Sequence, residues 1–399
     1  MREGWVETTL GDVAEWWSGG TPRAREPRYY ESGTVPWAVI ADMSKGIINS
    51  TNSYITEEAL ELIGGRLAPV GSVLISMYAT VGKSAIANIP LATNQAIAWS
   101  IPNQDKIMPF YLYLVSQQLE QEISDSARGA TQRNINRQML RDFSFQLPPL
   151  PEQKRIVDLV SSVDFYIDAL QQQSESAKRS RNAVLHELLT AGGEGWVETT
   201  LGEVAHLNPE QARDYDSDRL IKYIDLSTVT FDTGISSEID LLPFNEAPGR
   251  ARRIIREKDV IVSTVRPYLK GFAFVGKEFN GQIASTGFCV IRAKSESILS
   301  ELIWALVGSD DFVDFLIRRS TGSNYPAVRP NDISDFTFML PPLHDQETIS
   351  KLITTFDDTI RTLSVLINSA QNLRSGLLSE LLSGDHEIPA SYDKVIGAA

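Results

Sequence analysis

Residues 4–14 read GWVETTLGDVA, and residues 195–205 read GWVETTLGEVA. The two stretches agree at ten of eleven positions and begin 191 residues apart. A second matched pair lies late in each half, where residues 147–153 read LPPLPEQ and residues 340–346 read LPPLHDQ, 193 residues apart. Because the two spacings nearly agree, they predict a tandem duplication with few net insertions. A repeat of this length predicts two domains and not a solenoid.

The composition outside the repeats is typical of a folded chain. The 399 residues favour two or three domains, of which the repeat selects two. The single cysteine, Cys289, excludes an internal disulfide and a thiolate zinc cage, and it fits a reducing compartment. No apolar run approaches ~18 residues and no apolar signal core opens the chain, so we expect a cytoplasmic protein without a membrane partner.

The charge is acidic on average but uneven along the chain. A net charge of −14 argues against nucleic acid when it is taken alone. Arginines nevertheless gather at residues 23–28, 128–141 and 250–256. Because binding depends on how charge is distributed over the surface, these clusters still allow a DNA-binding surface. The alternative is that they only serve solubility.

Each half predicts a mixed region followed by a long helix. The pattern of β-branched and apolar residues predicts strands at residues 34–40, 71–77 and 258–263. Periodic apolar residues predict helices at 56–63, 108–124 and 297–318.

A heptad pattern follows the Pro-Pro pair of each half, since proline is tolerated at a helix start. Seam positions recur in alternating steps of four and three, which predicts a coiled-coil helix. In the first half they are Ile156, Val160, Val163, Ile167, Leu170, Ser174, Ala177, Arg181, Val184 and Leu188. Adding 193 gives the second seam, from Ile349 to Leu381, again with an arginine, Arg374, at the eighth place. We expect helices of roughly 35 residues and about 50 Å that pack antiparallel, or else pack each on its own domain.

Signatures of catalysis are missing. Gly82-Lys83-Ser84 lacks the earlier glycine of a phosphate-binding loop, and no G-x-G-x-x-G or H-E-x-x-H occurs. The four histidines, His186, His206, His344 and His386, show no metal spacing. The two domains have the size of recognition domains, and no set of catalytic residues is found. This indicates a protein that recognises a ligand and is not itself a catalyst.

Several motifs recur in order in the two halves. W-x-x-T-x-L-G-[DE]-V-A opens each half, and the first half continues with Gly19-Gly20-Thr21-Pro22 and Val35-Pro36-Trp37. RGATQRNIN at 128–136 and TGSNYPAVR at 321–329 precede the L-P-P-L segments and the heptad helices. With these motifs the chain resembles the specificity subunit of a type I restriction–modification system over nearly its whole length. One departure is Asn208-Pro209-Glu210, which stands where the first half has its Gly-Gly-Thr-Pro motif.

The resemblance implies an α+β fold with a pseudo-two-fold internal repeat. Two target-recognition domains of mixed α/β structure are expected, separated by two long antiparallel coiled-coil helices. The expected boundaries are 1–147 for recognition domain 1, 148–191 for spacer helix 1, 192–340 for recognition domain 2, 341–384 for spacer helix 2 and 385–399 for a flexible tail.

The resemblance also implies a function. Each domain would read one half of an asymmetric bipartite site in double-stranded DNA. The helices would set the spacer and dock two methyltransferase subunits, which bind S-adenosylmethionine and methylate adenine N6. Two restriction (motor) subunits that use ATP and Mg can join such complexes, while the specificity chain is no enzyme and binds no cofactor or metal itself. The alternatives are a type IIB-like or methylation-only system, or a non-DNA coiled-coil scaffold.

Candidate DNA-binding residues fall into base-reading and phosphate-binding groups. Arginine suits guanine, and Asn or Gln suits adenine. The connector before each spacer helix offers Arg128, Gln132, Arg133, Asn134 and Arg137, and then Ser323, Asn324, Tyr325 and Arg329. The loop after the central strand offers Tyr78, Thr80 and Lys83, and then Arg266, Tyr268 and Lys270.

Other arginines are expected at phosphates, where contacts set register without reading sequence. They are Arg23, Arg25, Arg28, Arg250, Arg252 and Arg253. Because Pro267 follows Arg266, we expect an extended backbone that holds Arg266 outward. The alternatives are a polar connector that only positions the helix, and ordinary loop polarity.

Overall fold

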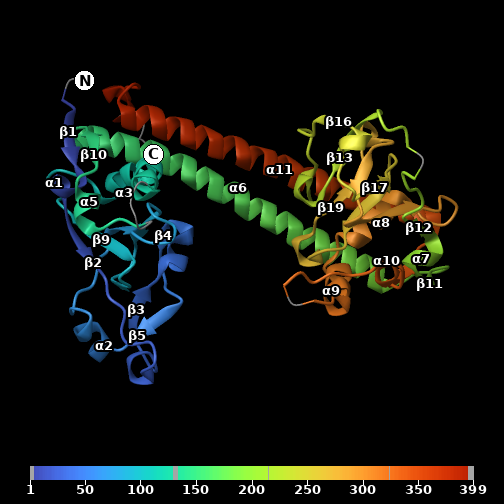
Figure 1. Ribbon diagram of the computed structural model, residues 1–399, viewed down its shortest axis with the longest axis horizontal. Coiled ribbons are helices and arrows are strands. Elements are labelled where there is room, and N and C mark those ends of the chain that lie inside the picture. Colours follow the sequence, from blue (N-terminus) through green and yellow to red (C-terminus); the bar gives the residue numbers. More distant parts are fainter. Residues whose placement is uncertain (1–3, 129–133, 214, 323, 394–399) are drawn as a thin grey trace. The chain divides into compact units, whose positions relative to one another are not determined.

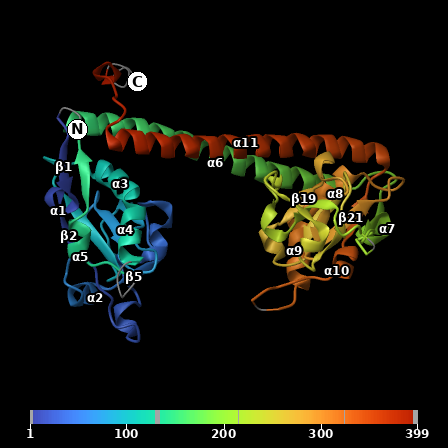
Figure 2. The same ribbon diagram turned by 45° about the horizontal axis from the view of Figure 1, so that its top comes forward.

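The chain forms two compact units, which are described separately here from a computed structural model (Figures 1 and 2). Unit 1 comprises Met1–Ile167 and Ala370–Ala399, and unit 2 comprises Asp168–Ser369. The structure describes residues 4–128, 134–213, 215–322 and 324–393.

Unit 1 is built on a mixed five-stranded sheet in the order β2-β9-β6-β7-β4, accompanied by a three-stranded sheet, β5-β3-β8. All four residues of the central strand β6 are buried. The strands are β2 (Ala14–Ser18), β3 (Val35–Ala38), β4 (Ile47–Ile48), β5 (Ser53–Ile55), β6 (Val73–Ser76), β7 (Ser84–Ala87), β8 (Ala92–Thr93) and β9 (Ile97–Pro102). The strands predicted at 34–40 and 71–77 are confirmed as β3 and β6.

The Gly-Gly motif of unit 1 serves packing. Gly20 donates its N–H to the carbonyl of Thr93 at 2.9 Å. A Cβ at Gly19 would lie 2.1 Å from the same carbonyl oxygen, and a Cβ at Gly20 would lie 2.7 Å from Cβ of Ile63. Only glycine allows these backbones to approach so closely. The motif therefore joins the chain after β2 to the segment that contains β8.

The helices of unit 1 differ from expectation at one point. The predicted helix 56–63 is confirmed as α2 (Glu57–Leu62), capped by the Thr56 hydroxyl. The segment predicted as one helix at 108–124 forms two, α3 (Pro109–Gln118) and α4 (Glu120–Arg128), with a break at Leu119. The apolar period runs through this break, so periodicity alone did not reveal it.

Unit 2 contains two four-stranded sheets and a two-stranded ribbon. Their strand orders are β12-β21-β18-β19, β16-β13-β20-β17 and β14-β15. The strands are β12 (Ala205–Leu207), β13 (Leu220–Ile224), β14 (Val229–Thr230), β15 (Gly234–Ile235), β16 (Leu241–Pro243), β17 (Ala251–Ile254), β18 (Val260–Ser263), β19 (Phe272–Phe274), β20 (Ile283–Ser285) and β21 (Phe288–Ala293). The prediction at 258–263 is confirmed as β18.

The helix predicted at 297–318 is also two helices, α8 (Ser300–Val307) and α9 (Asp310–Arg319). Ser309 starts the second helix, because its hydroxyl accepts the N–H of Phe312 at 3.2 Å. The cap at Ser309 therefore starts a new helix, even though the apolar periodicity continues through this position.

The repeated motifs form the same frame in both units. In unit 1, β1 (Val6–Thr9) pairs with β10 (Ser144–Leu147), and the short helices α1 (Leu10–Val13) and α5 (Arg137–Arg141) pack beside them. The counterparts in unit 2 are β11 (Val197–Thr200), β22 (Thr337–Leu340), α7 (Leu201–Val204) and α10 (Pro330–Ser334).

One buried glutamine anchors each L-P-P-L segment. The Gln153 amide accepts the Met108 N–H at 2.8 Å and donates to the Lys106 carbonyl at 2.9 Å. Gln346 likewise accepts the Leu299 N–H at 2.9 Å. Both glutamines are fully buried. The sequence repeat is therefore a structural repeat down to individual hydrogen bonds.

The two long helices are α6 (Leu150–Ala191) and α11 (Leu343–Ser383), and each contributes to both units. No described residue of either predicted seam is exposed. In unit 1, Ile156 near the start of α6 shares a core with Leu381 near the end of α11. In unit 2, Leu185 near the end of α6 shares a core with Ile353 near the start of α11. The helices therefore pair antiparallel, as predicted, and each also packs on its own domain.

The flexible tail expected from residue 385 is wrong for residues 385–393. Ile388 is 5% exposed and belongs to the core of unit 1. Arg155 of α6 holds both carboxylate oxygens of Asp393 at 2.7 Å, which keeps the pKa of Asp393 below its ordinary value. An apolar anchor and an ion pair thus fix this segment to the helix pair.

Candidate nucleic-acid interface

The central hairpins of the two units carry loops of matching geometry. We call residues 77–83 and 264–270 the hairpin loops, since they join β6 to β7 and β18 to β19. The strand before each loop ends in a serine, Ser76 or Ser263, whose hydroxyl donates to a carbonyl of the loop. Ala79 and Arg266, each three residues after that serine, both have left-handed backbones with φ of 58° and 49°. The loops are therefore structural counterparts.

The expectation of an extended backbone at Arg266 is wrong. Its φ of 49° and ψ of 58° are left-handed, although Pro267 follows. Tertiary contacts outweigh the local preference, because the Arg266 N–H donates to the Pro326 carbonyl at 2.7 Å. The guanidinium carbon lies 4.4 Å from the centre of the Tyr325 ring. The side chain thus rests on the connector and is half-buried.

Each connector lies beside the hairpin loop of its own unit. Ile135 donates its N–H to the Met77 carbonyl at 3.2 Å, and Val328 donates to the Thr264 carbonyl at 2.9 Å. Both donors belong to buried apolar residues that fix the connector in place. The described parts of the two segments that carry predicted base-reading residues are thereby adjacent in both units.

Some predicted connector residues lie outside the described part of the chain. These are Gln132, Arg133 and Ser323, together with the side chain of Arg128. Of the described ones, Asn134 is half-buried, whereas Arg137, Asn324, Tyr325 and Arg329 are exposed. Arg137 begins α5, and Arg329 directly precedes α10. Exposed side chains at these short helices have room to meet a ligand.

The hairpin-loop residues of unit 1 also reach the surface. Tyr78 is 43% exposed, Thr80 is exposed and Lys83 is half-buried. No described carboxylate forms an ion pair with Lys83. This loop therefore keeps a positive charge that is not neutralised by its own domain.

The arginines predicted at phosphates in unit 1 differ in their neighbours. Arg28 bonds Glu26 at 2.9 Å and lies 3.4 Å from Glu58. Arg23 also reaches Glu26, at 3.4 Å. Arg25 is exposed, and within the described residues no carboxylate pairs with it. Arg25 is thus the member of this group most available to a phosphate.

The arginine cluster of unit 2 lies next to its hairpin loop. Thr286 donates its N–H to the Arg250 carbonyl at 2.8 Å, and Thr264 donates to the Gly287 carbonyl at 2.9 Å. The start of β17, the turn after β20 and the hairpin loop therefore converge. Arg250 and Arg252 are exposed there. Arg253 is half-buried, and its Nε has no hydrogen-bond partner.

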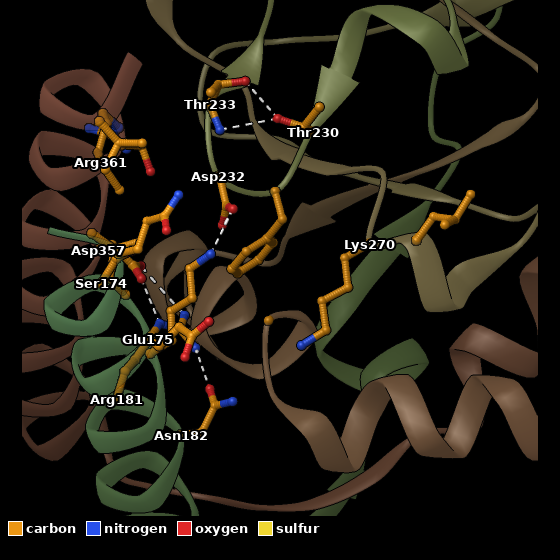
Figure 3. A pocket seen from close by; sticks show the side chains of 18 of the residues that line it. Ser174, Glu175, Arg181, Asn182, Thr230, Asp232, Thr233, Lys270, Asp357 and Arg361 are labelled. Atoms are coloured by element: carbon orange, nitrogen blue, oxygen red, sulfur yellow. Dashed lines mark hydrogen bonds and ion pairs between the residues drawn. The ribbon is translucent and has the colours of Figure 1, made fainter. Parts of the chain in front are cut away.

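Lys270 has different neighbours from the other predicted residues of its loop. Its ammonium lies 3.0 Å from Asp310. The side chain lines a cleft of about 960 Å³ in unit 2 (Figure 3). The walls of the cleft come from α6, α11, the β14–β15 turn and this loop. Lys270 therefore faces the helices, whereas Arg266 faces the connector.

A buried ion pair in this cleft was not predicted as part of a site. Arg181 of α6 is 1% exposed, and its Nε lies 2.5 Å from the Asp357 carboxylate of α11. The indole of Trp304 donates to the same carboxylate at 2.9 Å, which joins the domain to the helix pair. In unit 1, Arg374 of α11 pairs with Asp164 of α6 in the same way. The arginine shared by the two seams was the only indication of this arrangement in the sequence.

The departure at Asn208-Pro209-Glu210 also has a structural role. Glu210 accepts from Arg256 at 2.6 Å and from Arg292 at 2.5 Å. Arg292 additionally holds the buried Asp259 at 2.8 Å. The two guanidinium groups lower the pKa of Glu210 to about 2, with the Arg256 hydrogen bond as the largest cause. This network ties β21 to the segments that follow β12 and β17 and to the residue that precedes β18.

The described residues do not support a metal site or a reactive thiol. Within them, no group of three or more His, Cys, Asp or Glu side chains is placed to hold a metal ion. Burial raises the pKa of the Cys289 thiol to about 12, which opposes a nucleophilic role. None of the described helices has the length and apolar character needed to cross a membrane.

The family comparison matches both halves of the repeat. A model of the type I restriction modification DNA specificity domain matches residues 2–179 and again residues 193–371. Among curated proteins, the chain is 32% identical to the EcoR124I/EcoR124II specificity subunit of Escherichia coli over 171 residues, which cover 41% of this chain and 42% of that one. The MjaIX specificity subunit of Methanocaldococcus jannaschii is 28% identical over 43% of this chain and 40% of its own length. The chain thus matches about two fifths of the length of these two relatives.

Longer matches exist at lower identity. The MjaVIII specificity subunit of M. jannaschii is 20% identical over 96% of this chain and 93% of its own length. A crystal structure of a type I restriction–modification S subunit from M. genitalium has a TM-score of 0.57 at 13% identity, covering 96% of this chain and 97% of that one. This likeness concerns the fold.

Proposed function

Because the chain belongs to the family of type I restriction modification DNA specificity domains, we propose that it is the DNA specificity subunit of a type I restriction–modification complex. The observation that carries this proposal is the structural repeat. The same frame of strands, glutamine anchor and ion-paired helices occurs twice, and the strand order β2-β9-β6-β7 recurs as β12-β21-β18-β19, while the sequences of the attached loops differ. One frame with two different surfaces suits the two unlike half-sites of an asymmetric DNA target.

Each unit would read one half-site through its hairpin loop and connector. The exposed Arg25, Arg250 and Arg252 supply positive charge for phosphates. Such contacts make affinity fall with salt without carrying sequence information. Polar and aromatic side chains of the loops would then contact base edges in the major groove.

The helices α6 and α11 would set the spacer and dock two adenine-N6 methyltransferase subunits. Those subunits would bind S-adenosylmethionine, so the chain itself needs no catalytic residue or cofactor. Two restriction subunits, with ATP and Mg, would join where the system also cleaves DNA. The complex would act in the cytoplasm. The acidic net charge fits a chain whose helices face proteins while its partners supply much of the DNA contact.

Purification with the neighbouring methyltransferase subunits tests this function. We expect long-read sequencing of DNA exposed to the complex to reveal methylated adenines in one asymmetric site with two defined parts and a non-specific spacer. Methylation without a fixed sequence, or a complex that never forms, would contradict the proposal. Salt-dependent binding of the complex to a random DNA pool would separate it from a protein scaffold that does not bind DNA.

A further inference from the structure

The hairpin loop of unit 2 holds two long cationic side chains in a backbone conformation that such residues rarely adopt. Arg266 and Lys270 have φ of 49° and 47°. In the counterpart loop of unit 1, Ala79 and Gly82 have φ of 58° and 92°. Left-handed backbones at residues other than glycine cost free energy and gather at functional sites. Lys270 has an ion-pair partner in Asp310, whereas the Arg266 guanidinium has no carboxylate partner among the described residues.

The neighbours of Arg266 form a support for its guanidinium group. The group lies over the ring of Tyr325, 4.4 Å from the ring centre, and Nη2 donates to the Asn324 carbonyl at 3.3 Å. The Tyr325 side chain is itself 68% exposed, so its ring lies at the surface and not in a core. An aromatic ring that supports an arginine restricts the rotamers of that arginine. The planar fork is therefore held in one orientation before any ligand arrives.

The hydrogen-bonding capacity of Arg266 is left incomplete by its own domain. Among the described residues, no carboxylate forms an ion pair with it, whereas Arg256 and Arg319 of the same unit have such partners. Its Nε is buried and has no hydrogen-bond partner. A buried donor without an acceptor costs free energy and calls for an explanation. Because Nε is buried, a ligand would meet the Nη groups at the end of the fork.

We infer that Arg266 reads a guanine in the half-site bound by unit 2, with Tyr325 as the residue that positions it. This inference rests on the proposed function. Arginine donates two parallel hydrogen bonds to O6 and N7 of guanine in the major groove. A phosphate contact requires only charge, which needs neither a strained backbone nor an aromatic support. The left-handed backbone at Arg266 costs folding stability but fixes the orientation of its side chain. Recognition of a base edge depends on that orientation.

The conservative variant Arg266→Lys separates the two kinds of contact in the complex with methyltransferase subunits. Initial methylation rates are measured on duplexes that carry each of the four bases at every position of the unit 2 half-site. We expect preference for guanine at one position to fall about 10- to 100-fold, because lysine keeps the charge but not the planar fork. The half-site read by unit 1 stays unchanged.

Lys277→Ala is the matched control, since it also changes one exposed cation of unit 2. Lys277 follows β19, at the end of the β18–β19 hairpin opposite Arg266. We expect it to leave base preference intact. A uniform fall in rate on all duplexes with Arg266→Lys, or an unchanged preference, would overturn the guanine assignment. If the wild-type complex has no bipartite target, the proposed function fails instead.

Variants of the support provide a second readout. Tyr325→Ala should weaken the same guanine preference, whereas Tyr325→Phe, which keeps the ring, should retain it. Arg266→Gly should raise Tm, as Ala79→Gly should in unit 1, because glycine adopts the left-handed backbone without strain. Loss of guanine preference together with a higher Tm would support the inference. Retained preference in Arg266→Gly would overturn it.

Discussion

Arg266, Arg292 and Arg28 show that neighbouring side chains decide what an arginine does in this protein. Arg292 is committed to Asp259 and Glu210 and holds strands together. Arg28 shares its charge with the half-buried Glu26 and the exposed Glu58. Arg266 has an aromatic support and no acidic partner among the described residues. Sequence clusters of arginine therefore overstate the surface that is available to DNA.

The Glu210 network predicts a pH dependence of stability. The pKa of Glu210 is lowered from 4.5 to about 2 in the folded chain, so its stabilisation is complete above about pH 4.5 and is lost as the pH falls towards 2. Glu210→Gln should lower the free energy of unfolding by about 1–3 kcal/mol at pH 7, allowing for partial solvent screening. The difference from wild type should close between pH 4.5 and 2 in urea unfolding. Glu238→Gln, at an exposed position, should show no such convergence, and a gap that persists at pH 2 would contradict the assignment.

Sequence could predict the types of residue in the site but not their contacts. The connector and the loop after the central strand were predicted separately from residue type, and the structure places the two segments side by side. Local rules failed at Arg266, since an extended backbone before Pro267 was outweighed by the bond to Pro326. The ring of Tyr325 beneath Arg266 depends on two segments that are distant in sequence. No local pattern encodes such a pair.

At the scale of elements, the seam between α6 and α11 is mostly apolar and contains one arginine from each helix, Arg181 and Arg374. Arg181 pairs with Asp357 in unit 2, and Arg374 pairs with Asp164 in unit 1. A buried polar pair in a coiled coil is satisfied in one register only, so it can specify that register. The heptad pattern was legible in the sequence because it repeats. The breaks at Leu119 and Ser309 could not be recognised in the sequence, because the end or start of a helix can depend on a single residue.

The two ion pairs should differ in their contribution to stability. Arg181→Met leaves the Asp357 carboxylate, whose side chain is only 11% exposed, with the Trp304 indole as its donor. Breaking a buried pair in this way costs about 3–5 kcal/mol. Arg374→Met should cost about 1 kcal/mol, because the Asp164 side chain is 32% exposed. Urea unfolding of both variants checks this order, and equal losses would count against a special role for the buried pair.

At the scale of the whole molecule, the repeat assigns separate tasks to frame and loops. The frame was predicted from ten matched residues and is reproduced in paired strands, glutamine anchors and helices. The strand order β2-β9-β6-β7 of unit 1 also recurs as β12-β21-β18-β19 in unit 2, although the sequences between the repeated motifs differ. Divergent segments carry the recognition in this scheme, and conserved segments carry the assembly.

The spacer should follow the length of the helix pair. One heptad inserted after Ile167 and one after Ser369 would lengthen both helices by about 10 Å while preserving the seam. We expect the non-specific spacer of the methylated site to grow, by up to about 3 base pairs at 3.4 Å each. A seven-residue insertion after the exposed Glu238 is the control and should leave the spacer as it is. An unchanged spacer in the doubly lengthened chain would remove the ruler role from the helices.

Exchange of one recognition surface for the other tests the assignment of one half-site to each unit most directly. Residues 15–142 would replace residues 206–335, which keeps both long helices and both strand pairs of the frame and exchanges α10 and the partners of Gln346 for their unit 1 counterparts. Mapping of methylated adenines should then give a palindromic site, made of the unit 1 half-site twice in inverted orientation across the spacer. A complex that still methylates the original asymmetric site, or a site that is not symmetric, would contradict the assignment.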